Sequence, residues 1–103
     1  MGDTGLPRTL GIEEEYLIVD PATRDLVIDP PEGLLDDCAA RVPASAGDVK
    51  PEFLRAQVEV GTSVCHSVAE AREKLGELRR CVATAARAHG LAPIAASTHP
   101  IAD

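Results

Sequence analysis

Hydrophobic and polar residues alternate along two stretches of the chain in the manner of half-buried strands. The first stretch, TLGIEEEYLIVD at residues 9–20, is rich in the β-branched and aromatic residues that favour an extended strand. The second, EFLRAQVEVGTSV at residues 52–64, alternates apolar and polar side chains along most of its length. Because successive side chains of a strand point to opposite faces, each stretch predicts a sheet with one apolar and one polar face.

The spacing of apolar residues predicts a long helix over residues 67–89. Ser67 followed three residues later by Glu70 forms a capping box at its start, and Gly90 is expected just beyond its end. Apolar residues recur every three or four positions and form one stripe. The stripe comprises Val68, Ala71, Leu75, Leu78, Val82 and Ala85. We expect this helix to pack against the sheet and to take no part in chemistry.

Weaker patterns predict the segments in between. Residues 25–29 are apolar and follow a turn at residues 21–24, so we expect them to pair with the first strand in a hairpin. Residues 32–41 have apolar residues near helical spacing and predict a short helix. Residues 43–51, which contain two prolines, a glycine and small residues, are expected to form an exposed loop.

A last strand is predicted at residues 91–98, near a sheet edge or a bulge because Pro93 cannot donate a ladder hydrogen bond, and closed by His99-Pro100. Residues 1–8 are expected to be a flexible leader. The element order β-β-α-β-α-β predicts an α+β fold. Its mostly antiparallel sheet would have about four strands, with one long and one short helix packed on one face.

Composition narrows the class of protein. The 103 residues suffice for one domain or part of one, and one Phe, one Tyr and no Trp require an aliphatic core. The net charge of −7 lies in the first fifty residues, which argues against nucleic-acid and anionic-membrane partners and suits cation binding. Three irregularly spaced cysteines form no disulfide or zinc pattern, and neither a signal peptide nor a membrane span is visible, so a reduced cytoplasmic protein is expected.

The candidate chemistry lies in carboxylates on the polar faces of the two alternating stretches. Glu13 and Glu15 share one face of the first, where two like charges about 6.6 Å apart repel by about 2.5 kcal/mol at an effective dielectric of about 20. Such a pair is kept if it faces water, is partly protonated or holds a cation. Glu59 lies on the second stretch, and Glu52 begins it. If the strands are neighbours, Glu13, Glu15 and Glu59 can converge as oxygen ligands for Mg²⁺ or Mn²⁺, although a solvated face is the alternative.

Three segments together are more specific than this physical argument. TLGIEEEYLIVD, KPEFLRAQVEVGTSV and ASTHPIAD, in this order, resemble the beginning of the glutamate–cysteine ligase type 2 family, a group of bacterial carboxylate–amine ligases. The resemblance covers nearly the whole chain from Thr9 onward. It implies that residues 9–103 are the N-terminal part of an ATP-dependent ligase catalytic domain.

The resemblance also implies a site and a reaction. The family is similar to glutamine synthetase, whose curved antiparallel sheet forms a funnel that holds ATP and two or more Mg²⁺ ions. The metal ligands would be Glu13, Glu15 and Glu59, with Glu52 as a further candidate. Thr62 and His99 would lie near the glutamate or amine pocket. The γ-phosphoryl group of ATP would pass to glutamate, and the amine of cysteine or another amino compound would attack the resulting γ-glutamyl phosphate.

The chain departs from the family in its length, since members run to several hundred residues. We therefore expect a fragment, a truncated product or one piece of a split enzyme, inactive alone and partnered by the missing C-terminal part or a second copy. One alternative is a non-catalytic acidic interaction module that recruits a partner chain through its sheet edge. A remnant without a function of its own is the other.

Overall fold

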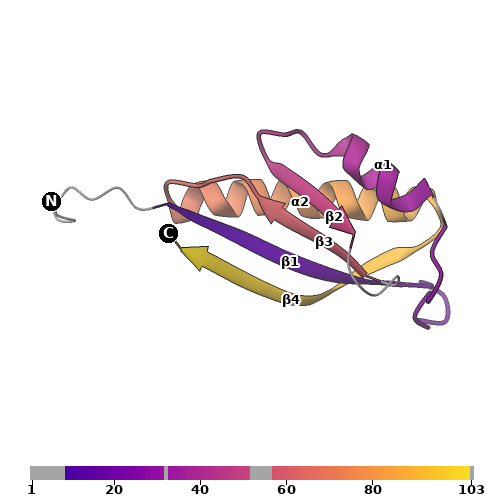
Figure 1. Cartoon of the computed structure of the whole chain (residues 1–103). Coiled ribbons are helices and arrows are strands. Elements are labelled where there is room, and N and C mark those ends of the chain that lie inside the picture. The colour runs from indigo at the N-terminus through magenta and orange to yellow at the C-terminus, as the bar shows by residue number, and fades with distance from the viewer. Residues whose placement is uncertain (1–8, 32, 52–56, 103) are drawn as a thin grey trace, which may run out of the picture.

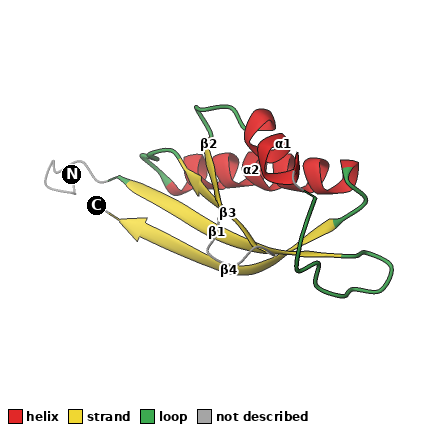
Figure 2. Ribbon diagram, turned by 45° about the vertical axis from the view of Figure 1, so that its right-hand side comes forward, coloured by secondary structure: helices red, strands yellow, loops and turns green. Residues whose placement is uncertain are grey.

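The fold is a four-stranded antiparallel sheet with both helices on one face (Figures 1 and 2). The computed structural model describes residues 9–31, 33–51 and 57–102, so the predicted leader at residues 1–8 lies outside the described residues. The elements in chain order are β1 (Leu10–Val19), α1 (Gly33–Arg41), β2 (Gly47–Pro51), β3 (Gln57–Thr62), α2 (Val68–Ala88) and β4 (Ala92–Ala102). The sheet order is β2-β3-β1-β4. The predicted α+β fold with one long and one short helix is confirmed.

Strand β1 lies inside the sheet, between β3 and β4, and its successive side chains point to the two opposite faces. Glu14, Tyr16 and Ile18 are buried on the face that carries the helices. Glu13 and Glu15, between and beside them in the sequence, are half-buried on the opposite face. The alternation predicted for residues 9–20 is therefore confirmed, and it sends the middle glutamate of the EEE run to the side opposite its neighbours.

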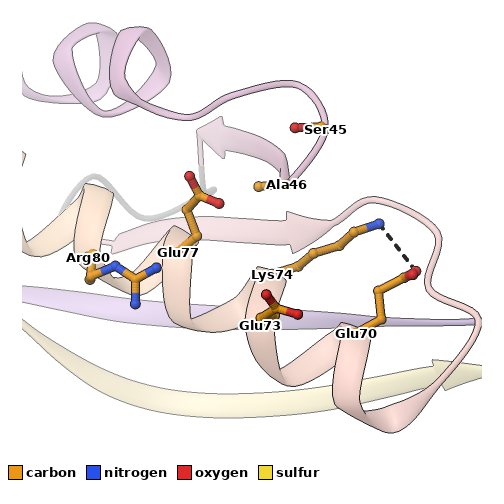
Figure 3. A pocket seen from close by; sticks show the side chains of 7 residues that line it. All are labelled: Ser45, Ala46, Glu70, Glu73, Lys74, Glu77 and Arg80. Carbon is orange, nitrogen blue, oxygen red and sulfur yellow. Dashed lines mark ion pairs between the residues drawn. The ribbon is translucent and has the colours of Figure 1, made fainter.

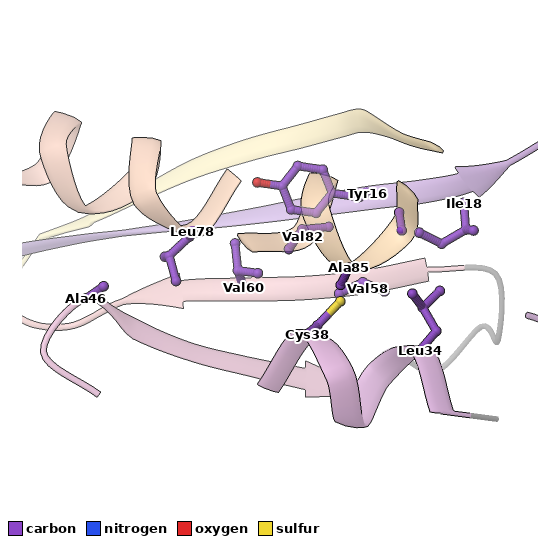
Figure 4. Close-up of a cluster of buried hydrophobic side chains, with 11 residues drawn as sticks. Tyr16, Ile18, Leu34, Cys38, Ala46, Val58, Val60, Leu78, Val82 and Ala85 are labelled. Carbon is purple, nitrogen blue, oxygen red and sulfur yellow. The ribbon is translucent and has the colours of Figure 1, made fainter. Parts of the chain in front are cut away.

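The core lies between the sheet and the two helices and is built of small aliphatic side chains (Figure 4). Val58 and Val60 of β3 face Leu78 and Val82 of α2, and Cys38 of α1 joins them. Its buried members in the described part of the chain are Tyr16, Ile18, Leu34, Cys38, Ala46, Val58, Val60, Leu78, Val82, Ala85 and Ala86. Tyr16 is the single aromatic residue among these members, as the composition requires.

Helix α2 begins and ends with the predicted signals. The Ser67 hydroxyl accepts a hydrogen bond from the Glu70 amide at 3.0 Å. At the other end Gly90 has φ 75°, and the Leu91 amide donates to the Ala86 carbonyl, which is a Schellman ending. One part of the prediction is wrong: Val68 is 71% exposed. It is the first residue of the helix, and the rest of the fold leaves that turn uncovered, so the buried stripe begins at Ala71.

Two predicted segments are corrected by the sheet. Residues 43–51 were expected to be a loop, but Gly47–Pro51 pairs with β3 as an edge strand, because that pairing outweighs the low strand propensity of its residues. Residues 25–29 were expected to be a strand, but they contribute only one isolated bridge, Val19↔Leu26. The neighbours of β1 are thus β3 and β4, and the predicted hairpin is wrong.

Strand β4 continues past His99-Pro100 to Ala102, so the predicted end is also wrong. Pro100 pairs with Ile12, whose amide donates to Thr62 on the other side of β1 at 2.9 Å. A proline at this position removes no hydrogen bond between β1 and β4. β4 also carries one unpaired residue, Ala96, where its register with β1 shifts. Pro93 lies on an edge strand, as predicted.

Two further observations bear on the expected class of protein. All three cysteines are free thiols, and Cys38 and Cys65 are buried. Burial raises the pKa of the Cys38 thiol to about 11, so this side chain behaves as an uncharged core residue. Neither helix in the described parts of the chain is long and apolar enough to cross a membrane.

The stripe of α2 generates a first prediction. Replacing Leu78, which is fully buried, with Ala should lower the free energy of unfolding by about 2–5 kcal/mol, because it removes apolar contacts and leaves a cavity. Val68→Ala, from the same predicted stripe but exposed, should change it by less than about 0.5 kcal/mol. Urea denaturation followed by circular dichroism measures both, and equal losses would contradict the described packing.

Candidate metal and substrate site

The register between β1 and β3 brings the predicted carboxylates onto one face of the sheet. Glu15 lies directly opposite Glu59, and Glu13 lies opposite Gly61, two residues further along the same face. The Ile12 amide points toward β3, so the backbone groups of Glu15 point toward β4 and the Glu15–Glu59 pair is a non-hydrogen-bonded one. In such pairs the Cα atoms are about 4.5 Å apart, which puts both carboxylates within reach of one ion.

A second row of residues crosses the same face. In sheet order the row reads Asp48, Gly61, Glu13 and His99, one from each strand. A Cβ atom built on Gly61 would lie 3.3 Å from Asp48 Oδ1 and 3.9 Å from Glu13 Cγ. The missing side chain thus keeps open the space that two carboxylates flank. Sequence reasoning missed Asp48 because it lies in the segment expected to be a loop.

The sheet face that carries Glu13, Glu15, Glu59 and Asp48, here called the acidic face, also carries a cationic side chain. Lys50 lies opposite Glu59 on β2, and its Nζ is 3.8 Å from Oε2 of Glu13. Its side chain is 51% exposed. Lys50, like Asp48, lies in the segment that was predicted to be a loop. The two residues are two positions apart, which puts them on one face only if the segment is a strand.

Each of the other predicted site residues has a separate position. Thr62 accepts a hydrogen bond from the Ile12 amide through Oγ1, which joins the ends of β1 and β3. His99 is exposed and lies opposite Glu13. Glu52 lies outside the described residues. The roles of Thr62 and His99 toward substrate stay predictions.

The middle glutamate of the motif is buried and is held by a hydrogen-bond network on the helix side. Arg79 of α2 donates from Nε to Oε1 and from Nη2 to Oε2 of Glu14, both at 2.7 Å. The hydroxyls of Tyr16 and Thr98 each donate to this carboxylate at 2.5 Å. The Arg79 hydrogen bonds outweigh burial and hold the pKa of Glu14 at about 2, so the carboxylate is ionised. Burial and the adjoining Glu14 raise the pKa of Tyr16, which remains a donor.

This network was missed from the sequence. Neither Glu14 nor Arg79 was among the site residues predicted from the sequence. The one signal was that a carboxylate on a buried face needs a cation, and Arg79 lies on the helix predicted to cover that face. The network ties α2 to β1 and β4, directly beneath the residues that form the acidic face.

The side chains of the acidic face are of the chemical type that binds a hard divalent cation. The potential ligands are carboxylate oxygens, and the Lys50 ammonium is 3.8 Å from one of them, Oε2 of Glu13. Within residues 9–31, 33–51 and 57–102, no three histidine, cysteine or carboxylate side chains are grouped closely enough to hold a metal ion as they stand. Metal binding would therefore require the half-buried glutamates to turn toward a shared point.

A separate hollow lies beside α2, on the helix side of the sheet (Figure 3). It measures about 280 Å³ and is lined by Glu70, Glu73, Glu77, Lys74, Arg80, Ser45 and Ala46. Lys74 pairs with Glu70 at 3.5 Å and donates to the Val64 carbonyl at 2.8 Å. The charges of Lys74 and Glu70 are thus already paired within the fold. The hollow is distinct from the acidic face.

Comparison with known proteins decides the family. A profile of glutamate–cysteine ligase family 2 (GCS2) matches residues 9–103. The chain belongs to this family. The resemblance inferred from the three sequence segments is confirmed, and the acidic face is accordingly that of a glutamate–cysteine ligase family 2 sheet.

Curated relatives agree with this assignment. Proteins from Rhodospirillum rubrum, Jannaschia sp. and Paracoccus denitrificans, each named "putative glutamate–cysteine ligase 2", are 60%, 54% and 48% identical to the chain over 96, 95 and 95 residues. Each alignment covers 92% of the chain and 25%, 24% and 24% of the relative. The family 2 chain thus spans about a quarter of the length of these relatives.

The hydrogen-bond network around Glu14 predicts how stability depends on pH. Because the pKa of Glu14 is lowered on folding, its stabilisation is complete above about pH 5 and is lost as the pH falls toward 2, by up to about 3 kcal/mol. The free energy of unfolding from urea titrations at a series of pH values measures this loss.

Glu14→Gln should lower stability at neutral pH and flatten the profile between about pH 5 and 2. The control, Glu73→Gln on the exposed surface of α2, should keep the slope of the unaltered chain. Parallel profiles for the chain and Glu14→Gln would show that Glu14 does not carry the acid sensitivity.

Proposed function

We propose that the chain forms the N-terminal part of an ATP- and Mg²⁺-dependent carboxylate–amine ligase. The proposed reaction joins glutamate to cysteine or another amine through a γ-glutamyl phosphate. The observation that carries the proposal is the register that sets Glu15 opposite Glu59, with Glu13 beside them on one face, in a chain of glutamate–cysteine ligase family 2.

Glu13, Glu15 and Glu59 are the residues that would hold Mg²⁺ or Mn²⁺, and Glu52 remains a candidate from the resemblance. When bound, the metal would neutralise charge on the phosphoryl group that is transferred. Its ligands come from two adjacent strands of one sheet, so their backbone positions are fixed relative to each other. A rigid ladder of this kind supports the preorganisation on which phosphoryl transfer depends.

The residues around the carboxylates would bind and orient the substrate. His99 is exposed on β4 directly opposite Glu13, so its imidazole can meet a polar group of a substrate held above that row. Thr62 fixes the end of β3 against β1 and would keep this rim in place. Tyr16, Thr98 and Arg79 hold Glu14 on the opposite side, and so stabilise the strands from which the outward residues project.

The proposal extends to the compartment and to metal binding by the chain itself. ATP and reduced cysteine are cytoplasmic substrates, and we place the reaction there. Because Glu13, Glu15 and Glu59 lie on two paired strands of this chain, we expect the chain to bind metal on its own.

The interaction-module alternative receives less support. An added strand could pair with either edge strand, β2 or β4; β4 contains Pro93 and Pro100, and β2 ends in Pro51. Pro93 and Pro100 pair with β1 residues whose backbone groups face away from β4, so the amide positions of both prolines point to the free edge of β4. Two of the donors that a strand added there needs are therefore missing.

Metal binding to the purified chain tests the proposal. Calorimetric titration with Mn²⁺ should give saturable binding that weakens at least about tenfold in Glu15→Gln and in Glu59→Gln, because each removes a charged oxygen ligand. Glu15→Gln and Glu59→Gln should also bind Mn²⁺ more weakly than the unaltered chain when ATP is present.

The control is Glu73→Gln, an exposed charge change on the helix α2. It should leave Mn²⁺ affinity within about twofold of that of the unaltered chain. Equal affinities for the chain, Glu15→Gln and Glu59→Gln would remove the acidic face as the metal site.

A further inference from the structure

The acidic face has two features that the proposed metal site does not use. One is Lys50, whose backbone is held in β2, and the other is its weak ion pair with Glu13. Lys50, Glu59 and Glu15 lie in one row across three strands. The ammonium of Lys50 reaches diagonally to Glu13 in the next row, at 3.8 Å. It therefore contacts one of the three carboxylates that the proposed metal would need, and its residue lies in the same row as the other two.

The geometry of this contact makes it exchangeable. The distance is long for a charged hydrogen bond, and 51% of the lysine side chain and 34% of the glutamate side chain are exposed. Exposed ion pairs of this kind contribute little to stability. A divalent cation with direct oxygen contacts would outcompete a single ammonium for Glu13, and the long flexible stem of Lys50 would allow its head to leave.

The backbone of Lys50 would stay in place after this exchange. The residue pairs with Glu59 in the ladder between β2 and β3, so its released ammonium remains over the same face. An anionic group delivered with the metal, above all a phosphate oxygen of ATP, would then lie nearest to it. Lysine suits this role because it binds phosphate as a mobile point charge.

We propose that Lys50 is a positioning residue that changes partner: it neutralises Glu13 in the metal-free protein and pairs with a phosphate group of the metal-bound nucleotide. The inference rests on the proposed function, because it requires metal binding by Glu13, Glu15 and Glu59. It goes beyond that proposal because it assigns Lys50 opposite effects on the binding of the metal ion and on the binding of ATP.

The test compares the purified chain with Lys50→Gln in calorimetric titrations with Mn²⁺ alone and with Mn²⁺ plus ATP. Lys50→Gln should bind Mn²⁺ alone roughly three- to tenfold more tightly, since a competing positive charge is gone. It should lose roughly three- to tenfold in the additional affinity that ATP confers. Added salt should shrink both ratios, because the charges are partly exposed.

Two variants control for charge and for folding. Lys50→Arg keeps the charge and should shift both affinities less than Lys50→Gln does. Arg72→Gln makes the same charge change on exposed α2, away from the acidic face, and should alter neither ratio. A purely structural role for Lys50 would move the urea midpoint and would not produce opposite shifts for the two ligands.

The outcomes separate this inference from the proposed function. If the unaltered chain binds Mn²⁺ but Lys50→Gln binds it equally or less tightly, the change of partner is refuted and the metal site stands. Tighter Mn²⁺ binding with an unchanged ATP effect refutes the phosphate contact. Absence of Mn²⁺ binding by the unaltered chain overturns both.

Discussion

The paired charges of Glu14 and Arg79 are the interaction on which the rest of the structure depends. A carboxylate with no exposed surface would be untenable without a partner, and here it receives four hydrogen bonds from three side chains. Those donors come from β1, α2 and β4, so one satisfied charge joins the sheet to its covering helix. Because β1 alternates, holding Glu14 inward also holds Glu13 and Glu15 outward.

The two sides of β1 therefore treat negative charge in opposite ways. On the helix side a single carboxylate is neutralised by a bidentate arginine and kept from water. On the other side Glu13 and Glu15 remain half-buried and accessible, with Glu59 across the ladder and Lys50 as a loose counter-charge. The first arrangement gives rigidity and the second leaves charge available for a ligand, which is the division expected where a scaffold carries a reactive surface.

Sequence reasoning was accurate where the pattern was local. The alternation of residues 9–20 and the capping box at Ser67 determine their elements by themselves, and both were predicted. It failed at Gly47–Pro51, whose composition favours a loop and whose strand exists only through pairing with β3. Asp48 and Lys50 were lost with that strand. The partner of Glu14 was missed for a related reason, since residues 65 positions apart meet only in the folded chain.

The unpaired residue Ala96 has a consequence for how β4 can vary. Pro93 and Pro100 are seven residues apart, an odd separation that in a regular strand would turn their nitrogens to opposite sides. The bulge reduces this to the six steps between Ile12 and Ile18, so both rings fit without breaking the ladder. Deleting Ala96 would leave the two prolines six residues apart, the separation of a regular strand without a bulge, and both pairs with β1 could be kept. Loss of this one residue should thus be tolerated in β4.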